Sequence, residues 1–190
     1  MTTHAGRVST PRHIPAGAPA SGDGIVVGTG TVVIDVYVDF LCPFCRQFEE
    51  TAGPTLHRLV DDGLVSIVYH PMAFLDQLSA DHYSSRASAA SGCAADGGLF
   101  VEYAEALFAN QPPEGGPGLT DDELIGIGDL VGLDPPFAGC VRDRTYLDWA
   151  AYVTDKAMER GVSGTPTVLV EDVPVPANVR SITQAVAAAR

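Results

Sequence analysis

Apolar and polar positions alternate early in the chain and predict a β-strand over residues 31–40. The apolar face of this strand is formed by Ile34, Val36, Val38 and Phe40. A period of two residues with many β-branched side chains is typical of a strand. Apolar residues then recur at helical spacing from Phe48 to Val60, so a helix follows. Residues 64–69 predict a second strand, and His70 is expected to be a turn residue beyond its end.

The middle of the chain, residues 79–160, has helical periodicity only. A capping box at residues 120–123 (Thr-Asp-Asp-Glu) indicates where one of its helices begins. Strand-like patterns return at residues 167–170 and 173–175, and Ser181 is expected to cap a final helix. The predicted order is therefore strand, helix, strand, a block of helices, two strands and a helix.

This order predicts an α/β chain in three parts. Residues 1–23 are rich in Pro, Gly, Ala and Ser and have no apolar period, so we expect a flexible tail. Residues 24–78 and 161–190 carry the predicted strands and are expected to form one α/β domain. Residues 79–160 are expected to form a helical domain inserted into it. The tail contains no apolar segment of the kind that a secretory signal needs.

The charge of the chain excludes two classes of partner. The sequence has 24 acidic residues and 11 Lys or Arg residues, which give a formal net charge of −13 at pH 7. A nucleic-acid binder needs basic side chains that neutralise phosphates, and an anionic membrane surface attracts the same residues. The apolar stretches are also shorter than the roughly 18 residues that a membrane-spanning helix needs. We therefore expect no nucleic-acid partner and no membrane span.

Cys42 and Cys45 carry the clearest chemical signal in the sequence. They stand at the start of the predicted helix, directly after the apolar strand. A thiol at a helix N-terminus lies near unpaired backbone N–H groups and the positive end of the helix dipole, which favour the thiolate. The thiolate is the form that attacks in thiol–disulfide exchange. We therefore predict that Cys42 is the nucleophile and that the more buried Cys45 is the resolving thiol.

A Cys-x-x-Cys pair is also half of a zinc site, or a chance event. Structural zinc needs four ligands in tetrahedral geometry. Cys93 and Cys140 are isolated in the sequence, and no His follows Cys45 at zinc-finger spacing. The strand that precedes the pair and the helix that begins with it favour redox chemistry over zinc. We predict no metal and no cofactor, and we assign none of the five histidines a catalytic role.

Thr165 and Pro166 form the second signal. The proline opens a predicted strand directly after a Gly-Val-Ser-Gly loop at residues 161–164. Most X-Pro bonds in folded proteins are trans, and only about 5–6% are cis. A cis bond at this position would turn the backbone of Thr165 toward the cysteine pair. Thr165 would then be able to pair, as a strand does, with an extended substrate peptide.

At these residues the chain resembles the thioredoxin superfamily and, within it, the DsbA-like bacterial thiol:disulfide oxidoreductases. The matching motifs are Asp39-Phe-Leu-Cys42-Pro-Phe-Cys45-Arg-Gln-Phe48-Glu and Gly161-Val-Ser-Gly-Thr165-Pro166-Thr-Val. The resemblance covers about residues 25–190 and implies a thioredoxin fold with an inserted helical domain. It implies a thiol:disulfide oxidoreductase that exchanges disulfides with protein substrates and depends on a redox partner that the sequence does not identify. It also implies that Cys42 is the nucleophile, Cys45 the resolving cysteine and Thr165-Pro166 a cis-Pro loop.

Three features depart from the pattern of that family. Phe44 stands where strongly oxidising members carry His, and Phe neither donates a hydrogen bond nor carries charge, so we expect a less oxidising couple. Many relatives hold a buried acid six residues before the first cysteine, where this chain has Val36. Asp39 is either a substitute for that acid or a solvated residue. Family members usually carry an export signal or a membrane anchor, and this chain shows neither.

The resemblance also bears on the substrate groove and on the other two cysteines. We expect a groove with an apolar lining that includes Leu41 and Phe44, with Met72 or Phe74 beside them. Cys93 and Cys140 are two free thiols or, as in some DsbA-like relatives, a disulfide between two helices. The even number of cysteines and the resemblance favour the disulfide.

Two alternatives to a DsbA-like oxidoreductase remain open. One is a cytosolic disulfide reductase or isomerase relative, because the same two thiols serve all of these directions. The other is a non-catalytic binding module that uses the cysteine pair as a static staple or a metal clamp. A second disulfide favours an oxidising compartment, whereas a start at Met1 without an export segment favours the cytosol. We expect the cell envelope, and the cytoplasm if Met1 is the native start.

Overall fold

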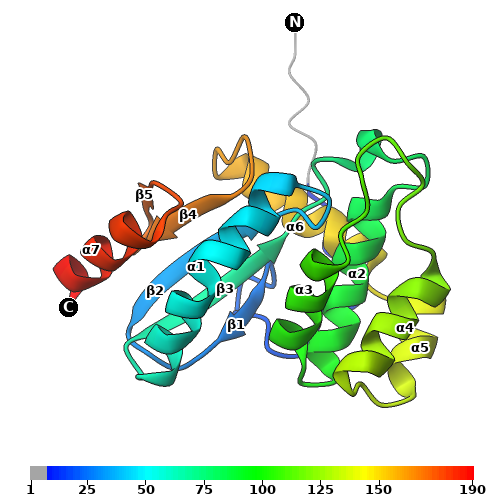
Figure 1. Ribbon diagram of the computed structural model, residues 1–190, viewed down its shortest axis with the longest axis horizontal. Helices are drawn as coiled ribbons and strands as arrows, with labels where there is room; N and C mark the ends of the chain where they lie inside the picture. The colour runs from blue at the N-terminus through cyan, green and yellow to red at the C-terminus, as the bar shows by residue number, and fades with distance from the viewer. Residues whose placement is uncertain (1–7) are drawn as a thin grey trace, which may run out of the picture.

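The computed structural model describes residues 8–190 and has a central sheet of five strands (Figure 1). The strands are β1 (Ile25–Val27), β2 (Val32–Val38), β3 (Val65–Pro71), β4 (Thr167–Val170) and β5 (Val173–Val175). Their order across the sheet is β1-β3-β2-β4-β5. β2 and β3 run parallel, with Ile34 opposite Ile67, and the other neighbouring strands are antiparallel. β2 is therefore the central strand, and its carboxyl end leads into the first helix.

Helices cover both faces of the sheet. α1 (Pro43–Asp61) and α7 (Val179–Ala189) pack on the face that carries the apolar side of β2. α6 (Leu147–Glu159) packs on the other face, where Tyr37 of β2 lies in a buried cluster with Ala157. In Figure 1, α1 lies in front of the sheet and α6 behind it. β2 is therefore buried on both faces, and only one of them follows the apolar alternation of the sequence.

The segment between β3 and β4 is helical, as expected for residues 79–160. Its elements are η1 (Asp76–Leu78), α2 (Tyr83–Asp96), α3 (Phe100–Ala109), α4 (Asp121–Val131), α5 (Pro136–Arg142) and α6. The predicted capping box is present, because Thr120 and Glu123 each accept from the backbone N–H of the other. Cys93 of α2 and Cys140 of α5 form a disulfide. In residues 8–190, no helix combines the length and the apolar character that a bilayer crossing requires.

Because α6 ends the helical segment and also covers the sheet, the two predicted domains share one layer of the structure. α6 packs against β3 and against α2. The division of the chain at residues 79–160 stays a prediction. The helical segment thus packs against β3 and against α1, the helix that carries Cys45.

Residues 8–23 differ from the flexible tail that the sequence predicts over residues 1–23. They lie against the helical segment, and the backbone carbonyl of Gly22 accepts from the buried Trp149 Nε1 at 2.8 Å. A segment without an apolar period is held here by backbone groups that meet polar atoms of distant side chains. Periodicity does not report such contacts. Residues 1–7 of the predicted tail lie outside the described residues.

Two local predictions also differ from the structure. His70 is a buried residue of β3 rather than a turn residue, with its ring stacked on Tyr37 at 4.2 Å between centroids. Its Nε2 lies 2.7 Å from Asp35 Oδ1, so polar residues of the neighbouring strand satisfy the imidazole within the sheet. The N-cap of α7 is Asn178, whose side-chain oxygen accepts from the N–H of Ser181. In both places the local sequence does not show the polar partner: Asp35 for His70, and the N–H of Ser181 for Asn178.

Candidate active site

Cys42 and Cys45 lie where the central strand passes into α1. β2 ends at Val38, and Cys42 is the N-cap residue of α1, whose first helical residue is Pro43. A proline suits this position because its missing N–H would have no helical partner. Cys42 is 4% exposed and Cys45, one turn further along the helix, is completely buried. Both are free thiols. The less buried thiol, Cys42, therefore lies at the start of α1, and the more buried thiol, Cys45, lies within α1.

The two thiols differ strongly in acidity. The pKa of Cys42 is lowered to about 6, chiefly because the Cys45 side chain hydrogen-bonds to its sulfur, and burial opposes this shift. A hydrogen bond with Thr165 and the backbone N–H groups of Cys45 and Phe44 lower it further. Burial, followed by the hydrogen bond and the charge of Cys42, raises the pKa of Cys45 far above its ordinary range. At neutral pH, Cys42 is therefore a thiolate and Cys45 a thiol that donates to it.

The loop between α6 and β4 reaches the same place. The Thr165–Pro166 peptide bond is cis, and the Cys42 Sγ lies 3.5 Å from the backbone carbonyl oxygen of Thr165. The two residues are 123 positions apart in the sequence. The fold therefore brings together the two motifs that the sequence analysis singled out separately.

Asp39 is a buried carboxyl group next to the cysteine pair. It is completely buried, so the solvated alternative is wrong, and its backbone N–H donates to Cys45 Sγ at 3.5 Å. Three groups donate to its carboxylate at 2.6 to 3.0 Å, namely the N–H groups of Leu41 and Leu75 and the hydroxyl of Ser84. Burial nevertheless raises the pKa of Asp39 to about 6. This carboxyl group therefore changes its protonation state close to neutral pH.

The predicted apolar lining of a substrate groove is only partly present at the surface. Phe44 is 69% exposed, because the residue after it, Cys45, takes the inward-facing position of the helix. Leu41 and Met72 are completely buried, so the prediction that they line a groove is wrong. Leu41 belongs to the main core, and the backbone of Met72 continues the pairing of the sheet. Phe74 is partly buried and packs beside Met72.

Gln111 is a residue of this site that the sequence analysis missed. It follows the end of α3 by two positions, and its Nε2 donates to the backbone carbonyls of Phe40 at 2.9 Å and Cys42 at 3.0 Å. The turn between β2 and α1 is therefore held from the helical segment. No local pattern announces this role, because the carbonyls that Gln111 satisfies lie about 70 residues away in the sequence.

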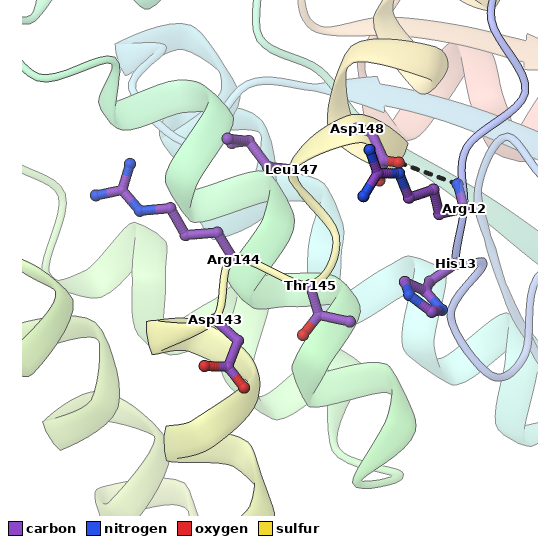
Figure 2. Close-up of a pocket in the computed structure, with 7 residues that line it drawn as sticks. All are labelled: Arg12, His13, Asp143, Arg144, Thr145, Leu147 and Asp148. Carbon is purple, nitrogen blue, oxygen red and sulfur yellow. Dashed lines mark hydrogen bonds between the residues drawn. The ribbon is translucent and has the colours of Figure 1, made fainter.

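A cavity of about 560 Å³ lies apart from the cysteine pair (Figure 2). Its lining residues are Arg12, His13, Asp143, Arg144, Thr145, Leu147 and Asp148. As Figure 2 shows, the Asp148 carboxylate accepts from the backbone N–H of Arg12, which joins the N-terminal segment to the start of α6. Neither cysteine of the pair lines this cavity, so the thiol chemistry described above does not use it.

The chain is similar to known proteins along most of its length. A family model described as thioredoxin matches residues 21–187. Among curated proteins, the serine/threonine-protein kinase PknE of Mycobacterium tuberculosis is 33% identical over an alignment of 159 residues, and the match covers 77% of this chain. The chain spans only 28% of the length of that relative. The likeness to PknE therefore concerns one part of a longer protein.

Two solved structures of Mycobacterium tuberculosis proteins are similar to this chain over most of their length. The reduced form of DsbG, a disulfide bond oxidoreductase, is 34% identical with a TM-score of 0.73, and the match covers 82% of this chain and 81% of DsbG. Reduced DsbA is 31% identical with a TM-score of 0.73, and the match covers 88% of this chain and all of DsbA. These matches confirm the expected fold class, a thioredoxin fold with an inserted helical domain.

Proposed function

Because the chain belongs to the thioredoxin family and has the fold of DsbA- and DsbG-type thiol-disulfide oxidoreductases, we propose that it exchanges disulfides with protein substrates through Cys42 and Cys45. The observation that carries the proposal is the 3.5 Å contact between Cys42 Sγ and the Thr165 carbonyl, next to a cis proline. An acidic thiol thus lies beside a backbone segment that is able to hold an extended peptide.

The proposed oxidation of a substrate proceeds in two exchange steps. A substrate thiolate attacks Cys42 Sγ of the Cys42–Cys45 disulfide, a mixed disulfide forms, and the sulfur of Cys45 leaves with the bonding electron pair and takes up a proton. A second substrate thiolate then attacks the substrate sulfur of the mixed disulfide, and Cys42 leaves as a thiolate. The substrate loses two electrons as its disulfide forms, and the cysteine pair gains them. The low pKa of Cys42 favours its departure.

We assign Asp39 the exchange of the proton that Cys45 gains or loses. Cys45 cannot react as a thiol and must give up its proton when the same steps run toward reduction of a substrate. The Asp39 backbone already contacts the Cys45 sulfur, and its carboxyl group has a pKa of about 6, raised by burial. This assignment makes Asp39 the counterpart of the acid that relatives hold at the position of Val36, which here is packed in the core.

We propose that Thr165, Pro166 and Phe44 bind the substrate. The backbone carbonyl of Thr165 lies 3.5 Å from Cys42 Sγ, and its peptide groups would pair with an extended chain beside the reacting sulfur. Phe44 offers an exposed aromatic ring within two residues of the reacting sulfur. Such a site recognises a backbone and an apolar side chain rather than one sequence, which suits a range of unfolded protein substrates.

The place of action that we propose is the cell envelope. The Cys93–Cys140 disulfide supports it, because structural disulfides persist in oxidising compartments. Each oxidation of a substrate leaves the cysteine pair reduced, so turnover requires a partner that withdraws two electrons from it. Fractionation that finds the protein in the cytosol with Cys93 and Cys140 reduced would favour the reductase or isomerase alternative.

The experiment that tests the proposed function compares matched variants. The wild-type protein is expected to catalyse the reduction of insulin by dithiothreitol and the oxidative refolding of a reduced protein. Cys42→Ala is expected to abolish both activities, and Cys45→Ala is expected to accumulate mixed disulfides that mass spectrometry detects. Gln47→Ala, an exposed position on the same helix, serves as the control that keeps both activities. Activity that survives Cys42→Ala, or a wild-type protein without activity, would overturn the proposal in favour of a binding module.

A further inference from the structure

Two carboxylates and an imidazole meet on the side of α1 that faces α3. Glu49 and His57 belong to α1, and Glu105 comes from α3 in the helical segment. His57 Nδ1 lies 3.2 Å from Glu105 Oε1, and His57 Nε2 lies 3.8 Å from Glu49 Oε1. One ligand atom from each residue lies within 4.8 Å of the other two. We call these three residues the Glu–His–Glu cluster.

The helix is built so that Glu49 and His57 converge. They are eight residues apart, about 12 Å along a helix axis, and the position between them on the same stripe is Gly53. A Cβ atom at Gly53 would lie 2.6 Å from the carboxylate oxygen of Glu49. A glycine inside a helix weakens it relative to alanine. Here it leaves the space into which the Glu49 side chain folds back toward His57.

The surroundings of the cluster favour a cation. In the described part of the chain, neither carboxylate forms an ion pair with a lysine or arginine, and His57 is the partner of both. A small cavity of about 10 Å³ lies beside the cluster; Glu49, His57 and Tyr69 line it together with apolar side chains. Within residues 8–190, the only cationic partner of the two carboxylates is therefore the imidazole of His57.

Tyr69 supports one ring nitrogen of His57. The ring of Tyr69 is buried, and its hydroxyl lies 3.4 Å from His57 Nε2. A metal-bound histidine commonly donates its second N–H to a neighbouring oxygen, which fixes the orientation of the ring. If Nε2 donates to Tyr69 in this way, Nδ1 is the nitrogen left for an ion, and Glu105 is the carboxylate beside it. Glu49 Oε1 lies nearer Nε2, at 3.8 Å, so the Glu49 side chain must turn to reach an ion on Nδ1. The spacing of 3.2 Å between Nδ1 and Glu105 Oε1 is close to that of two ligands held about 2.0–2.2 Å from one ion in tetrahedral geometry.

We propose that Glu49, His57 and Glu105 bind one zinc ion, with water completing the tetrahedron. An imidazole and carboxylates are ligands that Zn²⁺ accepts, whereas Mg²⁺ and Ca²⁺ prefer oxygen ligands only. The ion joins α1, which carries the cysteine pair, to α3 of the helical segment. The sequence analysis predicts no metal because it considers ligands at local spacing, and Glu105 lies far from Glu49 in the sequence. The proposal does not depend on the proposed function, since the ligands do not include either thiol of the pair.

The test uses tag-free, chelator-treated protein in which Cys42 and Cys45 are oxidised, so that their thiolates do not bind zinc. Zinc chloride is titrated into it by calorimetry, and the bound metal is counted after dialysis by elemental analysis. The wild-type protein is expected to bind one zinc ion per chain and to melt at a higher temperature with zinc than without it. His57→Ala and Glu105→Gln are expected to weaken binding by about tenfold or more. Glu102→Gln, an exposed acid one turn earlier in α3, is the matched control and should bind as the wild type does.

Gly53→Ala separates a metal site from a cluster of ordinary ion pairs. This variant keeps all three ligands and is expected to fold as well as the wild type, because alanine favours a helix more than glycine does. Its added methyl group moves the Glu49 carboxylate, so zinc binding is expected to weaken. Absence of stoichiometric zinc in the wild-type protein would overturn the proposal, as would binding of Mn²⁺ in preference to Zn²⁺. Zinc binding that survives in both His57→Ala and Glu105→Gln would place the ion elsewhere and would also overturn it.

Discussion

The acidity of Cys42 makes the stability of the reduced protein depend on pH. Its pKa in the folded protein is about 6, against 9.0 for an unperturbed thiol. A pKa that folding lowers contributes stability in full above the unfolded value, and this contribution is lost as the pH falls through the folded value. We therefore expect the free energy of unfolding of the reduced protein, minus that of the oxidised protein, to rise from pH 6 to pH 9. Urea denaturation of both forms across this range measures it, and a constant difference would contradict the lowered pKa.

The comparison of reduced and oxidised forms removes the contribution of other groups. Glu49 also titrates in this range, with a pKa raised to about 7 by burial and by Glu105. Its raised pKa contributes stability below its unfolded value and loses it as the pH rises through about 7. Because this group is present in both redox forms, its effect cancels in the difference. The pH dependence that remains belongs to the thiols and to Asp39, whose pKa depends on the charge of Cys42.

Asp39 bears a charge of the same sign as the Cys42 thiolate, and each raises the pKa of the other. We expect Asp39→Asn to lower the pKa of Cys42 further below about 6 and to slow the steps in which Cys45 exchanges a proton. Thiolate absorbance and the rate of iodoacetamide alkylation, both followed against pH, measure the first effect. Glu50→Gln, an exposed acid on α1, is the control. A Cys42 pKa that is the same in Asp39→Asn and wild type would contradict the charge effect, and unchanged rates of substrate reduction would contradict the proton exchange with Cys45.

Phe44 is expected to limit the oxidising strength of the cysteine pair. Its ring is exposed in the first turn of α1 and offers the Cys42 thiolate no side-chain donor. Phe44→His supplies a donor, and we expect it to lower the pKa of Cys42 by about one unit, which stabilises the reduced form by about 1.4 kcal/mol. The reduction potential should then rise by about 30 mV. Equilibration with glutathione measures the potential. Phe44→Leu provides the apolar comparison, and equal potentials for the His and Leu variants would contradict the argument.

The turn between β2 and α1 is held by a side chain from the loop that follows α3. Gln111 donates to the carbonyls of Phe40 and Cys42 and is partly buried. Gln111→Ala removes this donor from the Phe40 carbonyl, whereas the Cys42 carbonyl still accepts from the N–H groups of Cys45 and Arg46. A buried polar group without a partner costs about 1–3 kcal/mol. We expect this loss in the free energy of unfolding, measured with urea. Gln47→Ala on the exposed side of α1 should change it by less than about 0.5 kcal/mol. Equal stability of the two variants would mean that Gln111 is not needed to hold the turn.

Elements with a strong local signal were predictable, and contacts between distant segments were not. The alternation that ends at Phe40 and the helical spacing that follows place Cys42 at a strand-to-helix junction, and the capping box at residues 120–123 marks a helix start. In contrast, β1 is only three residues long, and nothing in its neighbourhood shows that it pairs with β3. Gln111 joins the loop after α3 to the turn between β2 and α1, and the Glu–His–Glu cluster joins α1 to α3. Such residues have no period or motif of their own, because their partners are fixed by the fold.

The complete fold makes the redox site a joint product of the sheet and the helical segment. The sheet contributes β2 and the cis-Pro loop, while the helical segment contributes Ser84 to Asp39 and Gln111 to the turn. The N-terminal segment is also attached to the helical segment, because Trp149 of α6 donates to the carbonyl of Gly22. We infer that a loss of structure in the helical segment changes the surroundings of the two thiols, because these hydrogen bonds are then lost. Removal of the Cys93–Cys140 disulfide, which joins two helices of this segment, therefore tests how far the thiols depend on it.

The Cys93–Cys140 disulfide closes a loop with a sequence separation of 47 residues and joins α2 to α5. In the chain-entropy model, a cross-link over such a loop stabilises the folded state by about 4 kcal/mol, because it restricts the unfolded chain. We expect the double variant Cys93→Ala and Cys140→Ala to lose stability of this order in urea denaturation. The wild-type protein, which keeps both the Cys93–Cys140 link and the cysteine pair, is the reference. Since α2 also supplies Ser84 to Asp39, the variant should show greater loss of thiol acidity at Cys42 than the wild type as urea is added. Equal stability of the variant and the wild type, or a non-reducing peptide map of the wild type without the linked pair, would contradict the expected stabilisation.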